Sequence, residues 1–476
     1  MRTLSPNTFL GLLVGVALCA TVSAAEAGLY HQEVLIDNPM AYYRLEETTG
    51  PTASSIGLVT IADGSIQTGV VLGQAGPRPA DGFAGFAATN NAPRFTAGEI
   101  DFGTGFMPTG AAPRTYELWF NADAVTPEIQ SVLSYGQNAG GRRINISADN
   151  STIAIAVSGE NRGKTGLSLS GWNHLAITFP KGQTSTSNWK MYLNGDPVTG
   201  LTSIAGSPQT LNTNDQPGAI GENAFGSGAY YKGLIDEVAV YQGELSADRI
   251  KAHYDAAVTG AVTPSQTTGF AMDEFQTAAK NGESPATGGQ FAGPLYIRER
   301  SNDATPEFEV RAFMKFDVAG LDADDVLNAT LLMHETSKLN DVNQAQIFAA
   351  LVTDDWDATS NKPTFDQAVD SASEFRIGQN GAASAGPDVD RYFGIEMTDW
   401  VKDWLSGSAS NYGLRLRFGD AHVGAAFDES GDFAPRLIVT SVRSATGVIP
   451  EPSTLVVWSL LGGLGMGLGW RRQRTK

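Results

Sequence analysis

The stretch "GWNHLAITFPKGQTSTSNWKMYLNGDPV", residues 171–198, contains two segments in which apolar and polar residues alternate. In each segment, 173–179 and 189–193, the large apolar side chains fall on one face of an extended chain. The second segment runs into Asn194-Gly195, a dipeptide typical of tight hairpin turns. This stretch therefore predicts antiparallel strands joined by short turns.

Similar alternating segments recur through residues 28–257, separated by glycine, proline and asparagine. Only "LSADRIKAHYDAA" near the end has helical periodicity, with Ser246 as a suitable N-cap and Ile250 and Tyr254 on one face. Short strands without intervening helices are typical of an antiparallel sandwich or barrel. We therefore expect one β domain over this region.

Five segments of this region, in order, resemble the laminin-G-like, concanavalin A-like jelly roll of exported bacterial proteins. They are "NPMAYYRLEETTG", "YELWFNA", "GWNHLAITF", "MYLNGDPV" and "GLIDEVAVYQGELSADRI". The resemblance implies a jelly roll over 28–257, with Trp119 and Trp172 filling its core. The fold hosts both lectins and glycosidases, so the fold alone does not decide function.

A glycosidase of this fold needs two carboxylates facing each other across the scissile bond. Laminarinase-like relatives place them as Glu-x-Asp-x-x-Glu on one strand, and the nearest approach here is "EIDFGTG". Glu99 and Asp101 are present, but Gly103 and Thr104 stand where the second glutamate is expected. The sequence therefore predicts a protein that is not an enzyme.

A small, polar stretch around "TGAVTPSQTTG" predicts a linker over 258–274. Beyond it, "FEVRAFMKFDV" and "YGLRLRF" alternate as half-buried strands, and "MTDWVKDWLSG" predicts a helix capped by Thr398 and ended at Gly407. Together with "ATLLMHE" and "IFAALVTDDWD", these pieces are similar to the DNRLRE or disaggregatase-related domain, related to the family 96 carbohydrate-binding modules. The resemblance implies a second β-sandwich over 275–442 that recognises polysaccharide. The predicted fold is thus all-β, with two tandem antiparallel β-sandwich (jelly-roll) domains and short helices.

Sugar binding needs flat aromatic faces and a few oriented polar groups. Tyr230 and Tyr231 in "GSGAYYKG" and Trp356 in "DDWDATS" are the candidates, because neighbouring glycines or short polar residues would leave the rings exposed. The alternative is that these rings pack against the sandwich cores.

Asp354, Asp355 and Asp357 could supply oxygen ligands to Ca²⁺, which prefers hard donors. They do not match an EF-hand loop, and the alternative is a solvated turn. The five histidines lack metal-binding spacing, so Ca²⁺ is the one cofactor that the sequence raises.

The two ends carry targeting signals. Residues 1–24 have the basic start, apolar run and small residues of a cleaved signal peptide. Residues 448–476 contain Pro450-Glu451-Pro452, an apolar segment over 454–470 and terminal arginines, which together resemble the PEP-CTERM sorting signal. An ordinary single-span anchor fits the apolar segment and the arginines equally well. The resemblance implies recognition by an exosortase and transient anchoring in the inner membrane.

The formal net charge of −19 argues against nucleic acid and anionic lipid as partners. We therefore expect an exported, non-catalytic protein of the cell surface or extracellular matrix that binds polysaccharide through its sandwiches. One alternative is a structural or adhesive envelope protein without glycan binding. The least favoured alternative is a glycoside hydrolase or lyase.

Overall fold

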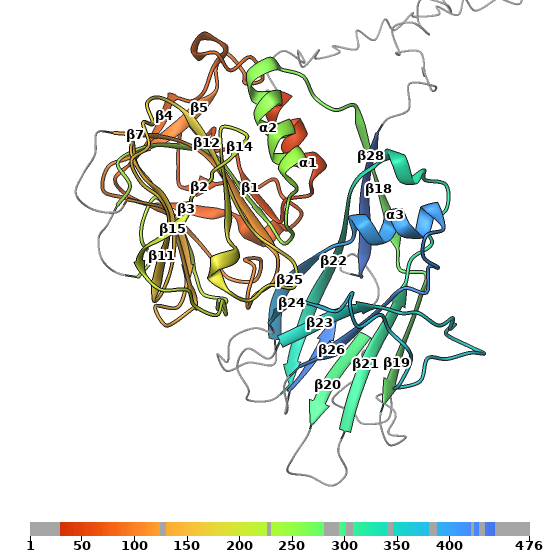
Figure 1. Ribbon diagram of the computed structural model, residues 1–476. Coiled ribbons are helices and arrows are strands. Elements are labelled where there is room, and N and C mark those ends of the chain that lie inside the picture. Colours follow the sequence, from red (N-terminus) through yellow and green to blue (C-terminus); the bar gives the residue numbers. More distant parts are fainter. Residues whose placement is uncertain are drawn as a thin grey trace, which may run out of the picture.

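The computed structural model describes residues 29–123, 130–225, 230–279, 295–300, 308–339, 346–379, 388–419, 423–427 and 434–442. Within these residues the strands form three sheets, two in the first domain and a large one in the second (Figure 1). Every strand pair described there is antiparallel, and the predicted all-β class is confirmed. Short 3-10 helices occupy the connections η1 (Thr60–Ala62), η2 (Pro79–Asp81), η3 (Thr186–Asn188) and η6 (Ala323–Asp325).

One sheet of the first domain has the order β14-β13-β12-β7-β17-β5-β4, with β1 beside β17. Its strands are β1 (Ala41–Tyr43), β4 (Val70–Ala75), β5 (Asn91–Phe95), β7 (Arg114–Ala122), β12 (Asn173–Phe179), β13 (Lys190–Leu193), β14 (Asp196–Pro197) and β17 (Gly233–Tyr241). The facing sheet has the order β15-β11-β10-β9-β8-β16-β6-β3-β2. Its strands are β2 (Thr52–Ala53), β3 (Gly64–Ile66), β6 (Ile100–Phe102), β8 (Ser131–Gly136), β9 (Arg143–Ala148), β10 (Ile153–Val157), β11 (Glu160–Lys164), β15 (Thr202–Gly206) and β16 (Gly218–Ile220).

Strand β7 is buried on both of its faces. Tyr116, Leu118 and Phe120 point into the core between the two sheets. Trp119 points to the other face, into an aromatic cluster with Tyr30 from the first helix. Because side chains alternate along a strand, one strand serves both layers. The core placement expected for Trp119 is found, on the helix side of the sheet.

Two helices cover that outer face, α1 (Leu29–Ile36) and α2 (Ala247–Thr259) (Figure 1). The predicted cap of α2 is confirmed, since Ser246 Oγ accepts a hydrogen bond from Arg249 N at 3.2 Å. Ile250 is buried as expected from the helical periodicity. Helix α1 was not expected from the sequence, because its apolar residues do not follow a clear helical stripe.

The hairpin predicted from Asn194-Gly195 is confirmed. Both residues have positive φ, 52° and 80°, and Leu193 of β13 pairs with Asp196 of β14. A two-residue turn with left-handed backbone at both positions matches the twist of the strands it joins.

The second domain is one sheet with the order β18-β28-β22-β27-β20-β21-β26-β23-β24, in which β19 pairs with β21 and β25 with β22. Its strands are β18 (Ser265–Ala271), β19 (Glu274–Ala279), β20 (Leu295–Arg300), β21 (Phe308–Lys315), β22 (Val326–Leu339), β23 (Gln346–Leu351), β24 (Phe375–Gln379), β25 (Asp388–Glu396), β26 (Leu414–Phe418), β27 (Val423–Phe427) and β28 (Arg436–Val442). A core of its own forms around its aliphatic and aromatic side chains.

Helix α3 (Thr398–Ser406) covers this core through Trp400, Val401 and Trp404, as the sequence predicts. Gly407, with φ 76°, ends it as expected. The predicted cap is wrong: Met397 holds the N-cap position, and Thr398 is the first helical residue. The Thr398 hydroxyl instead accepts a hydrogen bond from Ala329 N at 2.9 Å, which ties α3 to β22.

The expected linker is shorter than predicted, because Ser265–Ala271 forms strand β18. It pairs along its whole length with β28. Most of its side chains are exposed, since it is an edge strand, and so it shows no apolar periodicity.

The two domains meet along a contact that we call the seam, formed by β25 of the second domain and the loop after β6 together with Gln242 of the first. Tyr392 N donates to Gly105 O at 2.7 Å. Gln242 bridges the two sides: its Oε1 accepts from Gly394 N at 2.7 Å, and its Nε2 donates to Phe106 O at 2.8 Å.

A buried ion pair also crosses the seam. Arg391 Nη1 lies 3.0 Å from Asp215 Oδ2, and Arg391 Nη2 donates to Thr109 Oγ1 at 2.8 Å. Asn38 Nδ2 donates to Asn328 Oδ1 at 2.7 Å. These hydrogen bonds and the ion pair join residues of different domains, so the two domains are in direct contact and not connected by the linker alone.

Candidate functional site

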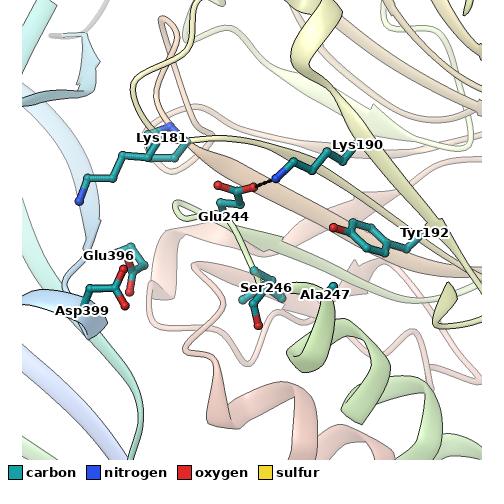
Figure 2. A pocket seen from close by; sticks show the side chains of 10 residues that line it. Lys181, Lys190, Tyr192, Glu244, Ser246, Ala247, Glu396 and Asp399 are labelled. Carbon is teal, nitrogen blue, oxygen red and sulfur yellow. Dashed lines mark hydrogen bonds and ion pairs between the residues drawn. The ribbon is translucent and has the colours of Figure 1, made fainter. Parts of the chain in front are cut away.

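A pocket of about 440 Å³ opens where the two domains meet (Figure 2). The first domain supplies most of its lining, and the second supplies Glu396 from the end of β25 and Asp399 from the first turn of α3. We call it the seam pocket. Its existence depends on the docking of the domains, because neither domain alone supplies both walls.

The lining of the seam pocket combines buried apolar residues with polar and charged ones. Pro113, Tyr192 and Leu245 line it and are buried. Ser246 and Ala247, at the start of α2, are exposed, so the pocket opens to solvent.

Two lysines reach the pocket in different ways. Lys190 Nζ pairs with Glu244 Oε1 at 2.6 Å, the contact drawn in Figure 2. Lys181 extends from the first domain to the second, where its Nζ lies 4.0 Å from the Phe375 ring centroid and 4.3 Å from that of Trp400. Burial lowers the pKa of Lys181, while Glu396 and Asp399 oppose that shift.

Glu396 anchors the second-domain wall. Its Oε1 accepts a hydrogen bond from Thr398 N at 2.7 Å, at the start of α3. Burial raises the pKa of Glu396, and the hydrogen bonds from Thr398 oppose the rise. The carboxylate is thus oriented by the helix and faces the pocket together with Asp399 (Figure 2).

A second polar surface, the Tyr230 patch, consists of Tyr230, Glu99, Asp101 and Glu222. Tyr230 is half-buried and forms a backbone bridge with Glu222. Burial raises the pKa of Glu99, and the nearby Glu222 and Asp101 raise it further. Glu222 and Glu99 raise the pKa of the Tyr230 phenol. The patch therefore combines one aromatic ring with several carboxylate acceptors.

Two of the rings predicted to contact sugar do not face solvent. Tyr231 is 0% exposed, and its ring lies 6.4 Å from that of Phe95 between centroids. Tyr230 forms an antiparallel bridge with Glu222, and Tyr231 N donates to Gly221 O, so the backbone is extended at these residues. Side chains alternate along an extended backbone, and Tyr230 and Tyr231 therefore point to opposite sides. The prediction of an exposed platform is wrong for Tyr231.

Trp356 is also in the core, with 1% exposure. Its Nε1 donates to Tyr412 O at 2.8 Å, and its ring meets Phe313 edge to face at 6.1 Å between centroids. The tryptophan in the loop after β23 points inward, where it covers Phe313 of β21 within one small apolar cluster. The predicted exposure of Trp356 is therefore wrong as well.

The three aspartates considered for Ca²⁺ do not converge on one point. The Asp357 carboxylate accepts hydrogen bonds from Ser360 and Thr359 and so shapes its own turn, which holds its pKa below the usual range. Asp355 pairs with Lys315 at 3.2 Å, and only the backbone oxygen of Asp354 accepts a bond, from Gln367 Nε2. Among the residues that the structure describes, no group of three or more His, Cys, Asp or Glu side chains is arranged to hold a metal ion.

Sequence reasoning did not find the seam pocket. Its residues come from five separate stretches of both domains, and nothing in their local spacing signals a site. The sorting motif Pro450-Glu451-Pro452, the signal peptide and the apolar segment 454–470 lie outside the described residues. Within the described ranges, no helix has the length and apolar character needed to cross a membrane.

Residues 96–251 match a protein-family model described as the concanavalin A-like lectin/glucanases superfamily. The jelly roll predicted for the first domain is confirmed over these residues, and the fold class includes carbohydrate-binding proteins. This match does not extend to the DNRLRE-like or PEP-CTERM resemblances. No curated protein matches the chain.

Solved structures show distant likeness. Domain 4 of AbnA, a GH43 extracellular arabinanase from Geobacillus stearothermophilus, is 16% identical at a TM-score of 0.31, covering 46% of this chain and 98% of that one. Trypanosoma rangeli sialidase is 12% identical at 0.32, covering 45% and 32%. The binding domain of Paraclostridial Mosquitocidal Protein 1 is 10% identical at 0.34, covering 84% and 99%. At these scores the likenesses carry no conclusion about function.

Proposed function

We propose that the protein is a non-catalytic, exported glycan-binding protein that acts at the cell surface or in an extracellular matrix. The observation that carries this proposal is the match of residues 96–251 to the concanavalin A-like lectin/glucanases superfamily. The resemblance of residues 275–442 to DNRLRE-like domains supports polysaccharide recognition by the second domain as well.

The Tyr230 patch is the proposed contact surface on the first domain. A half-buried tyrosine offers one ring face to the C–H side of a pyranose, and carboxylates accept hydrogen bonds from sugar hydroxyls. Glu99 and Glu222 lie close enough to Tyr230 to raise the pKa of its phenol. The patch thus holds both kinds of group that a sugar site requires.

Sorting follows from the two ends of the sequence. We propose that residues 1–24 direct export and that an exosortase acts at Pro450-Glu451-Pro452, after transient anchoring in the inner membrane through 454–470. Replacing Pro450 and Pro452 by alanine should leave the chain in the inner-membrane fraction. Release of the variant to the same extent as the wild type would overturn this part of the proposal.

Binding is tested with the full-length chain in pull-downs on insoluble polysaccharides and on a glycan array, with and without Ca²⁺. We expect retention by one polysaccharide class, a loss of at least about tenfold in affinity for Tyr230→Ala, and near wild-type binding for Tyr230→Phe, which keeps the ring. Retention of no polysaccharide by the wild type would overturn glycan binding and favour a structural or adhesive envelope role.

The absence of catalysis is tested on the same polysaccharides. We expect no new reducing ends and no unsaturated products after prolonged incubation, because the patch lacks the second glutamate of the laminarinase-like pattern. Product release that is abolished by Glu99→Gln or Glu222→Gln would identify a glycoside hydrolase or lyase instead.

A further inference from the structure

We propose that the seam pocket is a second glycan site that binds a short, uncharged saccharide between the two domains. This inference rests on the proposed function in that the ligand is a sugar. The site is distinct from the Tyr230 patch, which lies on the first domain alone.

The charge of the pocket argues for an uncharged ligand. Lys190 is already neutralised by Glu244, at 2.6 Å. Lys181 reaches from the first domain to the second-domain wall, where it faces two carboxylates and its ammonium group lies against the rings of Phe375 and Trp400. The pocket therefore has a slight excess of negative charge, which repels uronic acids and other anionic sugars. This net charge is too small to select a cation.

The polar atoms of the pocket match hydroxyl groups. Ammonium groups only donate hydrogen bonds, carboxylates only accept them, and the Ser246 hydroxyl does both. A sugar carries several hydroxyls that each donate and accept, so different hydroxyls of one saccharide can meet donors such as Lys190 and acceptors such as Glu396 or Asp399. The buried lining residues Pro113, Tyr192 and Leu245 offer apolar surface to the C–H faces of a sugar ring.

Size and access set the length of the ligand. A volume of about 440 Å³ is at the small end of the roughly 300–1,000 Å³ typical of small-molecule sites. Exposed Ser246 and Ala247 leave one side open to solvent. The pocket thus suits a short saccharide or the end of a longer chain, and a ligand there would contact both domains.

The experiment is calorimetric titration of the full-length chain with a panel of neutral hexose oligosaccharides and matching uronic-acid oligosaccharides. Ala247→Trp places a bulky ring at the exposed rim, whereas Ala247→Ser keeps the pocket open and serves as the matched control. We expect the neutral ligand to bind the wild type and Ala247→Ser alike, and the seam-pocket component of binding to be at least about tenfold weaker in Ala247→Trp, whereas any component from the Tyr230 patch is unchanged. Uronic-acid oligosaccharides should bind at least about tenfold more weakly than neutral ones.

Tyr230→Ala separates this inference from the proposed function. Binding that is lost in Tyr230→Ala but unchanged in Ala247→Trp would overturn the seam pocket and leave glycan binding intact. Binding of no sugar by the wild type would overturn both. If Ala247→Trp fails to fold, hydrogen exchange of the wild type decides: bound ligand should protect residues 181–192 and 396–401, and unchanged exchange in both segments would overturn the seam pocket.

Discussion

Glu117 is a carboxylate with no exposure that nevertheless has four side-chain partners. It accepts hydrogen bonds from the hydroxyls of Tyr30 and Tyr241, both at 3.0 Å. His174 Nε2 lies 2.7 Å and His253 Nδ1 2.9 Å from its oxygens. Burial alone would raise its pKa, but the two histidines hold it well below the usual range. These partners come from β12, β17, α1 and α2, so the network ties both helices to the sheet.

His253 contributes a positive charge to this network. Its Nε2 contacts Asp37 at 2.8 Å, so each ring nitrogen faces a carboxylate. Burial lowers its pKa, but Glu117 and Asp37 more than offset this and raise it from 6.5 to about 9. The raised pKa means that this charge stabilises the folded state fully below pH 6.5, and that the contribution is lost as pH rises through 9.

We therefore predict that His253→Gln lowers the free energy of unfolding by about 3 kcal/mol at pH 6. The difference between wild type and variant should shrink between pH 7 and pH 9.5, measured by urea denaturation. Glu237, whose pKa is raised by burial from 4.5 to about 7, lowers the stability progressively as pH rises from 4.5 to 7, but it does so equally in wild type and variant. If the difference in free energy of unfolding between wild type and variant stays constant from pH 7 to pH 9.5, His253 carries no charge in the folded state.

Among the secondary-structure elements, the β13–β14 hairpin packs closely against α2. A Cβ added to Gly195 would lie 3.0 Å from Lys251 Cδ and 3.0 Å from Tyr254 Cβ, both on the helix. Two features of the turn therefore favour glycine at position 195: its positive φ of 80°, and the close approach of its backbone to Lys251 and Tyr254 of α2.

Gly195→Ala should destabilise the protein by more than the roughly 1–2 kcal/mol that a left-handed alanine costs. Gly166→Ala is the matched control, because Gly166 has a similar φ of 72° and no atom lies within 4 Å of the point that an alanine Cβ would occupy there. Urea denaturation of the two variants measures the contact with α2 as the difference between them. Equal decreases in the free energy of unfolding of the two variants would mean that the hairpin does not pack closely against the helix.

Across the molecule as a whole, Arg391 joins the two domains. It is 1% exposed and pairs with Asp215, which is 9% exposed. Tyr392 and Leu332 of the second domain also belong to the apolar core of the first. The seam is therefore packed like a domain interior.

Arg391→Ala should lower the free energy of unfolding by about 3–5 kcal/mol, because it leaves the Asp215 carboxylate buried and unpaired. The double variant Arg391→Leu with Asp215→Leu should recover much of this loss, since no charge then remains buried. Arg94→Ala is the control: its pair with Asp123 at 2.8 Å is largely exposed and should contribute under about 1 kcal/mol. An Arg391→Ala protein as stable as the Arg94→Ala protein would show that the seam is not a packed interface. Urea denaturation gives all three values.

The all-β class, the Asn194-Gly195 hairpin, α2 with its Ser246 cap and the buried face of α3 were predictable from the sequence. Each of these depends on residues close together in the chain, whose spacing alone selects a backbone conformation. Tyr231, Trp356 and strand β18 were predicted wrongly. Whether a ring in a loop faces solvent, or a polar stretch is an edge strand, depends on what a distant strand places beside it, here Phe95, Phe313 and β28.

The local elements and the kind of domain they build follow from the amino-acid order alone, because periodicity and turn chemistry act over a few residues. How the domains dock became visible only in the folded chain, and with it the Arg391–Asp215 pair and the seam pocket. Lys181 and Asp399 stand more than two hundred positions apart, and their approach follows from the burial of apolar and charged groups along the whole seam. No local pattern encodes such a contact, since its free energy comes from surfaces of two domains whose residues are far apart in the sequence.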